Sequence, residues 1–231
     1  MKRATIRFFI QIYLAIFFIT TLIRLSRSPF TKNIESMVTK RNIVVLGNSV
    51  FDNRSYVSTN ASIPYLLNEH EYLNAKVYAM DGATIGNINN QLQLSLKAID
   101  NIDQTLFISI GGKEILTYKE KENANKNEEK KQIIKFIDDI FGDYRNVLKN
   151  YDFKCNVVLC NIYIPYSKKK TIYETCIQLW NKKILSYAQN NNYKVMKLDE
   201  LLYKKEDFAD KLQPSRIGGE KIVKHMISFI N

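Results

Sequence analysis

Histidine and cysteine, which supply much of the chemistry of protein active sites, are scarce: the 231 residues contain two histidines and three cysteines. Neither His70 nor His225 stands at metal-ligand spacing from another histidine or a cysteine, so we predict no metal centre and no cofactor. Cys155 and Cys160 share one strand-like run, which would place their Cα atoms about 16 Å apart, too far for a disulfide. We therefore expect buried free thiols, and whether Cys176 could reach either of the others depends on the fold.

Glycine and proline are also few, with eight and four residues, whereas 45% of the chain is hydrophobic. This composition is enough to bury one α/β core. Strand-like runs alternate with segments of helical periodicity, and such alternation predicts a parallel sheet with helices on both faces. We expect strands at 42–48, 75–80, 105–110, 155–163 and 193–198, and helices at 60–70, 86–99, 128–150, 171–190 and 217–230.

The N-terminal segment is one apolar stretch, residues 8–23, interrupted by Gln11 and two threonines. Its length approaches that needed to cross a bilayer, and no A-x-A cleavage pattern follows it. We interpret residues 1–28 as an uncleaved signal anchor forming a transmembrane helix, with a buried amphipathic helix as the alternative. Residues 29–41 would then form a basic linker, and residues 42–231 the folded domain.

The excess of basic residues is concentrated at the N-terminal end. The net charge is +11, and up to Arg41 eight lysines and arginines face the single Glu35. Such a flank attracts anionic lipid headgroups by about 1 kcal/mol per residue near the surface, so the basicity indicates a membrane partner and not a nucleic acid. We expect a single-pass membrane protein whose domain lies, by analogy with ordinary signal anchors, on the non-cytosolic side.

The segment with the clearest chemical signal is Asn42-Ile-Val-Val-Leu-Gly-Asn-Ser49. The apolar run is typical of a strand in the core of a parallel sheet, and Gly47 permits a tight exit from it. The hydroxyl of Ser49 would then lie at the carboxyl edge of the sheet, where ligands of such folds bind. A serine at this place is equally typical of a helix cap, so the segment alone does not establish a nucleophile.

Three further segments, each containing glycine or aspartate, follow Ser49 along the chain. Residues 81–87 read Asp-Gly-Ala-Thr-Ile-Gly-Asn, residues 108–114 read Ile-Ser-Ile-Gly-Gly-Lys-Glu, and residues 210–215 read Asp-Lys-Leu-Gln-Pro-Ser. Together with Gly-Asn-Ser they resemble the four signature blocks of the SGNH (GDSL-type) hydrolases: Gly-Asp-Ser, a Gly-containing loop, Gly-X-Asn-Asp and Asp-X-X-His-Pro. The resemblance spans about residues 42 to 230. It implies a flavodoxin-like three-layer α/β/α sandwich with its active site at the carboxyl ends of the strands.

The resemblance also implies roles for particular residues. Ser49 matches the nucleophile, and its N–H would form the oxyanion hole with that of Gly86, which matches the block glycine. Lys113 stands where the family places the oxyanion-hole asparagine. Gln213 stands where it places the catalytic histidine, and Asp210 matches the aspartate that orients that histidine. The chain therefore resembles a divergent branch in which two site residues differ.

The missing histidine decides whether the resemblance extends to catalysis. An amide such as that of Gln213 has no useful basicity, although it can orient a hydroxyl. Asp210, or Asp52 just beyond the serine, would have to act as a direct base, and a carboxylate with a pKa near 4 does so poorly. Lys113 could stabilise an oxyanion as a cation, but a surface lysine that points away fits the pattern equally well.

Three hypotheses about function remain open. The first is a membrane-anchored serine esterase or acyl-transfer enzyme, of weak activity, that acts on an O-acyl group of a glycan or lipid. The second is a catalytically inactive domain of the same type that binds such a ligand. The third is a scaffold in which the blocks survive only as turns of the fold.

Overall fold

The computed structural model of the protein describes residues 16–21, 40–119, 125–166 and 172–230. The chain divides into two compact units, Met1–Lys40 and Arg41–Asn231. The second unit contains the segments that the sequence analysis connects with function.

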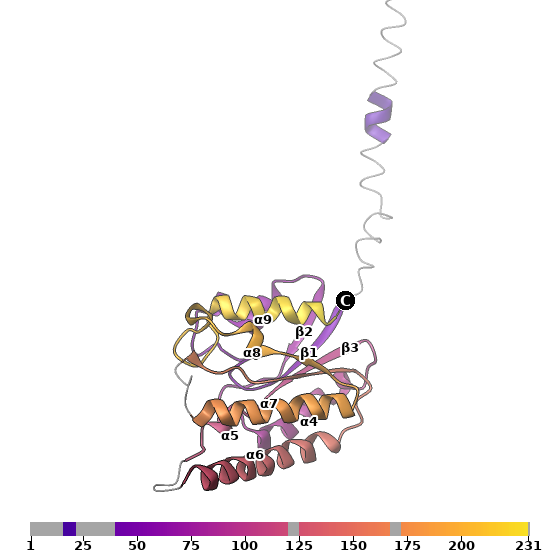
Figure 1. Ribbon diagram of the computed structural model, residues 1–231. Helices are drawn as coiled ribbons and strands as arrows, with labels where there is room; N and C mark the ends of the chain where they lie inside the picture. Colours follow the sequence, from indigo (N-terminus) through magenta and orange to yellow (C-terminus); the bar gives the residue numbers. More distant parts are fainter. Residues whose placement is uncertain (1–15, 22–39, 120–124, 167–171, 231) are drawn as a thin grey trace, which may run out of the picture. The chain divides into compact units, whose positions relative to one another are not determined.

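A parallel sheet forms the centre of the Arg41–Asn231 unit (Figure 1). Among the described residues it has five strands, in the order β2-β1-β3-β4-β5. The strands are β1 (Arg41–Gly47), β2 (Leu73–Val77), β3 (Gln104–Ser109), β4 (Asn156–Cys160) and β5 (Lys194–Met196). This order is that of flavodoxin-like doubly wound sheets, in which ligands bind beyond the carboxyl ends of the strands. The predicted parallel α/β architecture is therefore confirmed.

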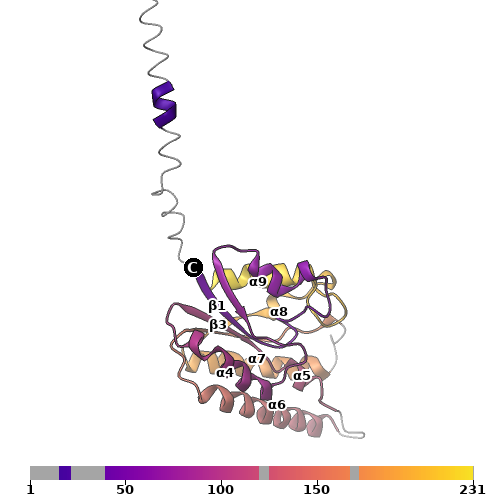
Figure 2. The ribbon, with the colours of Figure 1, turned by 180° about the vertical axis from the view of Figure 1, so that it is seen from behind.

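Helices cover both faces of the sheet (Figures 1 and 2). One layer consists of α4 (Ile85–Ile99), α6 (Lys126–Lys149) and α7 (Ile172–Asn190). The other consists of α3 (Ile63–Asn68), α8 (Leu198–Leu201) and α9 (Arg216–Ser228). Shorter helical turns are η1 (Thr59–Ala61), α5 (Gly112–Ile115) and η3 (Lys205–Asp207). Strand β1 contributes side chains to the core on both faces of the sheet. Val44 faces the α4 side and Ile43 the α9 side, because successive side chains of a strand point to opposite faces.

The predicted elements are found, with bounds that differ by a few residues. Strand β4 ends at Cys160, earlier than expected, because the next residues leave the ladder: the amide of Asn181 bonds both the N–H and the C=O of Ile162, at 2.9 and 2.8 Å. The first predicted helix begins later than expected, because Ser62 caps it by accepting from the N–H of Tyr65.

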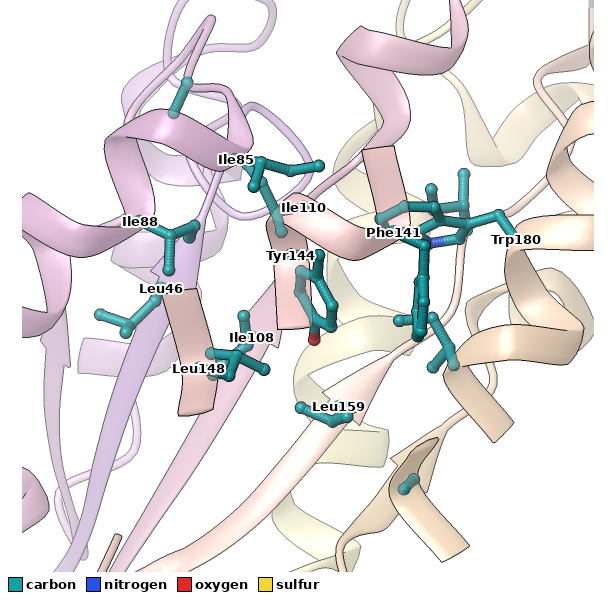
Figure 3. Close-up of a cluster of buried hydrophobic side chains, with 14 of the residues drawn as sticks. Leu46, Ile85, Ile88, Ile108, Ile110, Phe141, Tyr144, Leu148, Leu159 and Trp180 are labelled. Atoms are coloured by element: carbon teal, nitrogen blue, oxygen red, sulfur yellow. The ribbon is translucent and has the colours of Figure 1, made fainter. Parts of the chain in front are cut away.

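An aromatic cluster fills the core on the α6 and α7 side (Figure 3). The ring of Phe141 meets that of Trp180 edge to face with centroids 5.4 Å apart, and Tyr144 lies 5.5 Å from the same indole. All three cysteines are buried and unpaired, which confirms the prediction of free thiols. Burial raises the pKa of Cys155 and of Cys176 to about 11, so these thiols have little tendency to ionise.

The N-terminal segment requires a correction. Its described part, residues 16–21, is helical and has exposed apolar side chains. Within the described residues, no helix combines the length and apolarity that crossing a membrane requires. The predicted single-pass membrane localisation is therefore not supported, and the rest of the predicted anchor lies outside the described residues.

Candidate active site

The path of the chain at the end of β1 places Ser49. Gly47 adopts a φ of +142°, and a Cβ at this position would lie 2.1 Å from the carbonyl oxygen of Ser109 on the neighbouring β3. The buried amide of Gln91 on α4 clamps the same residue, accepting from its N–H at 2.7 Å and donating to its C=O at 2.8 Å. Only glycine fits this exit from the sheet.

The turn after Gly47 is closed by Asn48. Its backbone oxygen accepts from the N–H groups of Phe51 and Asp52, both at 3.0 Å, and its side-chain oxygen accepts from that of Val50 at 3.1 Å. Within the described part of the chain, neither the N–H nor the hydroxyl of Ser49 has a hydrogen-bond partner. Both groups are therefore free to contact a ligand.

Ser49 lines a cavity of about 380 Å³ at the carboxyl end of the sheet. The cavity draws residues from the segments after β1, β2, β3 and β4 and from the loop before α9. Its lining comprises Asn48, Ser49, Val50, Tyr56, Asp81, Gly82, Ala83, Gly112, Lys113, Leu116, Ile162, Tyr163, Pro165, Ile177, Leu212 and Gln213. The structure thus brings Ser49, Lys113 and Gln213 together, whereas Gly86 and Asp210 are not part of this wall.

Two glycines, Gly82 and Gly112, line the cavity, and Gly82 is the one that follows β2. It occupies a loop between β2 and α4 with a φ of +75°, and no described residue accepts a hydrogen bond from its N–H. Gly86, which the sequence analysis selected, lies instead in the first turn of α4. Gly47 is the last residue of β1, whereas Gly82 lies beyond the end of β2, so the sequence around Gly47 offers no pattern that would select Gly82 over Gly86.

Lys113 points toward the cavity and not away from it. Its ammonium donates to the carbonyl oxygen of Gly82 at 2.6 Å, which ties the loop after β3 to the loop after β2. The neighbouring Glu114 does not pair with this ammonium: its Oε1 accepts from the N–H of Ile85 at 2.5 Å, at the start of α4. The carboxylate therefore stabilises the helix N-terminus, while the cation remains beside Gly82.

The loop before α9 presents Gln213 to the cavity. Its backbone N–H and that of Leu212 both donate to Oδ1 of Asp210, each at 2.7 Å, so this aspartate shapes the turn. Gln213 is only 7% exposed, and its side-chain oxygen has no hydrogen-bond partner among the described residues. The turn is also tied to the segment after β1, because the buried amide of Asn53 donates to the oxygen of Pro214 at 3.0 Å.

Asp52 is held in its ionised form. Burial by itself raises its pKa, but a 2.6 Å hydrogen bond from Arg54 and another from the N–H of Asp81 outweigh this effect and hold the pKa below the ordinary value. Such a carboxylate is a poor proton acceptor for a serine. Neither histidine lines the cavity: His70 packs on Tyr72 and His225 on Phe229.

Two tyrosines that sequence reasoning missed complete the polar wall. Tyr56 donates to both carboxylate oxygens of Asp81, at 3.1 and 3.2 Å, and burial together with this bond raises its pKa. Tyr163 donates to the carbonyl oxygen of Leu212 at 2.8 Å, and burial raises its pKa strongly. Within the described chain, no group of histidine, cysteine, aspartate and glutamate side chains is arranged to hold a metal ion.

The Asp52 interactions predict a particular acid response. Because the folded-state pKa of Asp52 lies below the unfolded value of about 3.9, its carboxylate stabilises the fold above that pH, and this contribution is lost as the pH falls through the folded pKa. We expect the free energy of unfolding, measured in urea from about pH 6 to about pH 3, to decline less in Asp52→Asn than in the wild type. Asp139→Asn, which alters an exposed ion pair with Lys135, is the control and should leave the decline unchanged. An equally steep decline in Asp52→Asn would contradict this account.

Comparison with solved structures identifies proteins that have a similar fold. No protein-family model and no curated protein sequence matches the chain. A member of the lipolytic protein G-D-S-L family from Veillonella parvula DSM 2008 has a TM-score of 0.62 at 14% identity, over 81% of this chain and 96% of that one. Phospholipase A1 from Streptomyces albidoflavus NA297 has a TM-score of 0.59 at 15% identity, over 82% of this chain and 99% of that one. A putative acylhydrolase from Bacteroides fragilis NCTC 9343 has a TM-score of 0.58 at 15% identity, over 86% of this chain and 93% of that one.

These proteins are similar to the chain in structure far more than in sequence. The alignments cover 81 to 86% of this chain, and the fold implied by the sequence blocks is the one that is found. The resemblance to SGNH hydrolases is therefore confirmed at the level of architecture: the chain has the fold of the G-D-S-L lipolytic proteins.

Proposed function

We propose that the Arg41–Asn231 unit is a serine esterase or acyl-transfer enzyme of SGNH type that acts slowly on O-acyl groups of a glycan or lipid. The observation that carries the proposal is the convergence of Ser49, Gly82, Lys113 and Gln213 on one cavity at the carboxyl edge of the sheet. The names of the structural neighbours, which include a phospholipase A1 and a putative acylhydrolase, support the same class of reaction.

The cavity contains donors for an oxyanion. When the hydroxyl oxygen of Ser49 attacks an acyl carbonyl, a new C–O bond forms and negative charge moves onto the carbonyl oxygen. The free N–H groups of Ser49 and Gly82 can donate hydrogen bonds to this oxygen, and one preorganised donor of this kind is worth about 2.7 to 4 kcal/mol. Lys113, bound to the oxygen of Gly82, adds positive charge at the same edge. Collapse of the intermediate breaks the ester C–O bond, and the alcohol leaves with the proton that serine gave up.

The weak step is removal of that proton. The amide of Gln213 cannot act as a base near neutral pH. Asp52 is paired with Arg54, and Asp210 uses one carboxylate oxygen to accept from two backbone N–H groups of its own turn. When a serine hydrolase loses its base, the remaining rate enhancement over the reaction in water is only about 10³- to 10⁴-fold. This remainder comes from substrate binding and the oxyanion hole. Slow turnover is the expected consequence.

The same observation favours a second candidate function, a ligand-binding domain without catalysis. In that case the free N–H groups and the lysine would bind the carbonyl of an acyl ester, and Ser49 would remain unmodified. The two functions share the cavity and differ only in whether Ser49 reacts.

Covalent labelling distinguishes them. A fluorophosphonate probe incubated with the full chain should label Ser49 slowly, as peptide mass spectrometry would show, because the oxyanion donors stabilise charge on the phosphonyl oxygen while the site has no strong base for the serine proton. Ser49→Ala should abolish the label, while Ser55→Ala, which changes an exposed serine nearby, should retain it. An unlabelled protein whose Tm rises with a short acyl ester would instead support the binding function. Neither label nor stabilisation would leave only a structural role for the blocks.

A further inference from the structure

The turn that contains Gly82 has the geometry of a type II β-turn. The N–H of Ala83 donates to the carbonyl oxygen of Met80 at 3.1 Å, and this bond closes the turn over Asp81 and Gly82. The φ of Gly82 is +75° and that of Asp81 is not positive, which is the combination that type II requires. Glycine has more backbone freedom than any other residue, so the direction of its free N–H depends on what holds the turn.

Two consecutive residues of α5 hold the segment that begins at Gly82. The ammonium of Lys113 donates to the carbonyl oxygen of Gly82 at 2.6 Å. The carboxylate of Glu114 accepts from the N–H of Ile85, the first residue of α4, at 2.5 Å. The two side chains therefore bond the two ends of segment 82–85, one as a donor and the other as an acceptor.

Helix α5 is a firm base for these contacts. Gly111, at its N-cap, has a φ of +104°, and a Cβ there would lie 2.4 Å from the indole of Trp180 on α7. Trp180 and Ile115, the last residue of α5, are both fully buried. Because protein interiors are close-packed, α5 has little freedom to move against the core, and groups bonded to it are held in place.

Glu114 keeps its contact under unfavourable conditions. Its second carboxylate oxygen, Oε2, is buried and has no hydrogen-bond partner among the described residues, a state that native proteins rarely retain without a reason. Glu114 is not part of the cavity wall, so contact with a ligand is not that reason. The hydrogen bond that the described residues give its side chain is the one from Ile85, which favours a role in holding this segment.

We propose that Lys113 and Glu114 are positioning residues, which together hold the turn so that the N–H of Gly82 donates to the oxygen of a ligand that reacts with Ser49. This inference rests on the proposed function, because it specifies how one of the two oxyanion donors is preorganised. It also gives a role to a lysine at the position where the SGNH pattern has an oxyanion-hole asparagine: the ammonium acts through the carbonyl of Gly82 and does not need to touch the ligand.

The test measures how fast a fluorophosphonate labels Ser49 in the full chain. A series of probe concentrations separates the maximal labelling rate from the concentration that gives half of it. Lys113→Met, which removes the ammonium and keeps an unbranched side chain, should lower the maximal rate about tenfold, less than the loss of about 10² to 10³ for a whole oxyanion donor. The half-saturating concentration should change little, because the donor acts on charge that develops during the reaction.

Glu114 distinguishes positioning from a direct effect of charge. Glu114→Met removes a negative charge, and electrostatics alone would then favour a developing oxyanion and speed the reaction. Loss of the contact with Ile85 should instead slow labelling, as in Lys113→Met. Glu114→Gln retains an oxygen that can accept from Ile85 and should label near the wild-type rate. The matched control is Lys135→Met, which removes an exposed ammonium that donates to Asp139 at 2.6 Å on α6, and it should leave labelling unchanged.

The amide of Gly82 provides a readout that needs no reaction. In two-dimensional amide NMR spectra of the full chain, Lys113→Met should shift or broaden the resonance of Gly82, because the turn loses one of its contacts. The resonance of Gly142, on α6, should not change. Lys113 is exposed, so this variant should fold and the measurement remains decisive even if Glu114→Met does not fold.

The outcomes separate this inference from the proposed function. A wild-type labelling rate in Lys113→Met, or an unchanged Gly82 resonance, would overturn the inference and leave the esterase proposal standing. Slower labelling of Lys113→Met together with faster labelling of Glu114→Met would also overturn it, because the ammonium would then act directly on the oxyanion. If the wild type is not labelled at Ser49, the esterase proposal fails, and the Gly82 resonance alone shows whether Lys113 holds the turn.

Discussion

Replacing Gln213 by histidine is expected to raise kcat/KM for p-nitrophenyl acetate by about 10²-fold or more. The side chain at this position already lines the same cavity as Ser49, and we therefore expect an imidazole placed there to reach the serine hydroxyl. A positioned general base raises the reaction rate by a factor of about 10² to 10⁴. We expect the lower end of this range, because nothing in the wild-type cavity is arranged around an imidazole. Asp210 can orient the ring, since only its Oδ1 is engaged by the described residues.

Three variants test whether the gain arises from the proposed constellation. Ser49→Ala in the Gln213→His background should return the rate to that of buffer. Asp210→Asn in the same background should lose part of the gain. Gln189→His, which places an imidazole on the exposed surface of α7, should gain nothing. A rate increase that survives Ser49→Ala would show that the imidazole attacks the ester directly, and the account of Ser49 as the nucleophile would fail.

The sequence is sufficient to predict the sheet and the approach to the cavity, because both follow from local patterns. Apolar runs such as that of β1 can be buried only between two helical layers, and the break at Gly47 marks where the chain leaves the sheet. The choice between Gly82 and Gly86 is different. Both follow the second strand, and only the backbone path, a left-handed loop residue at one and the first turn of α4 at the other, decides which one lines the cavity.

The polar contacts of the site depend on pairings that no local pattern contains. Gln91 clamps Gly47 from 44 positions away, and Tyr56 meets Asp81 across 25 positions. These distances in sequence become contacts only once the strand order and helix positions are fixed. Asp210 is a related case: its spacing from Gln213 predicts a side-chain partner, and in the structure its Oδ1 accepts from two backbone N–H groups of the turn that it shapes.

Gly47→Ala is expected to lower the free energy of unfolding by about 3 to 5 kcal/mol, which for a chain of this length lowers the Tm by about 10 °C. Two causes combine. A φ of +142° is strained for any residue with a side chain, and the added Cβ would lie 2.1 Å from the backbone oxygen of Ser109, which the parallel pairing of β1 with β3 holds in place. Relief of the clash must move the end of β1, and with it Ser49, so fluorophosphonate labelling should also slow well below the Tm.

The control is Gly142→Ala, in the interior of α6, where a Cβ meets nothing within 4 Å. There the substitution should stabilise the fold by about 0.5 to 1 kcal/mol, because alanine loses less backbone entropy in a helix. Gln91→Met tests the same turn without adding a Cβ: it leaves the N–H and C=O of Gly47 without their side-chain partners and should cost about 2 to 4 kcal/mol. If Gly47→Ala unfolds at the wild-type temperature and labels at the wild-type rate, then the turn after β1 tolerates a side chain, and the tight exit that we describe does not position Ser49.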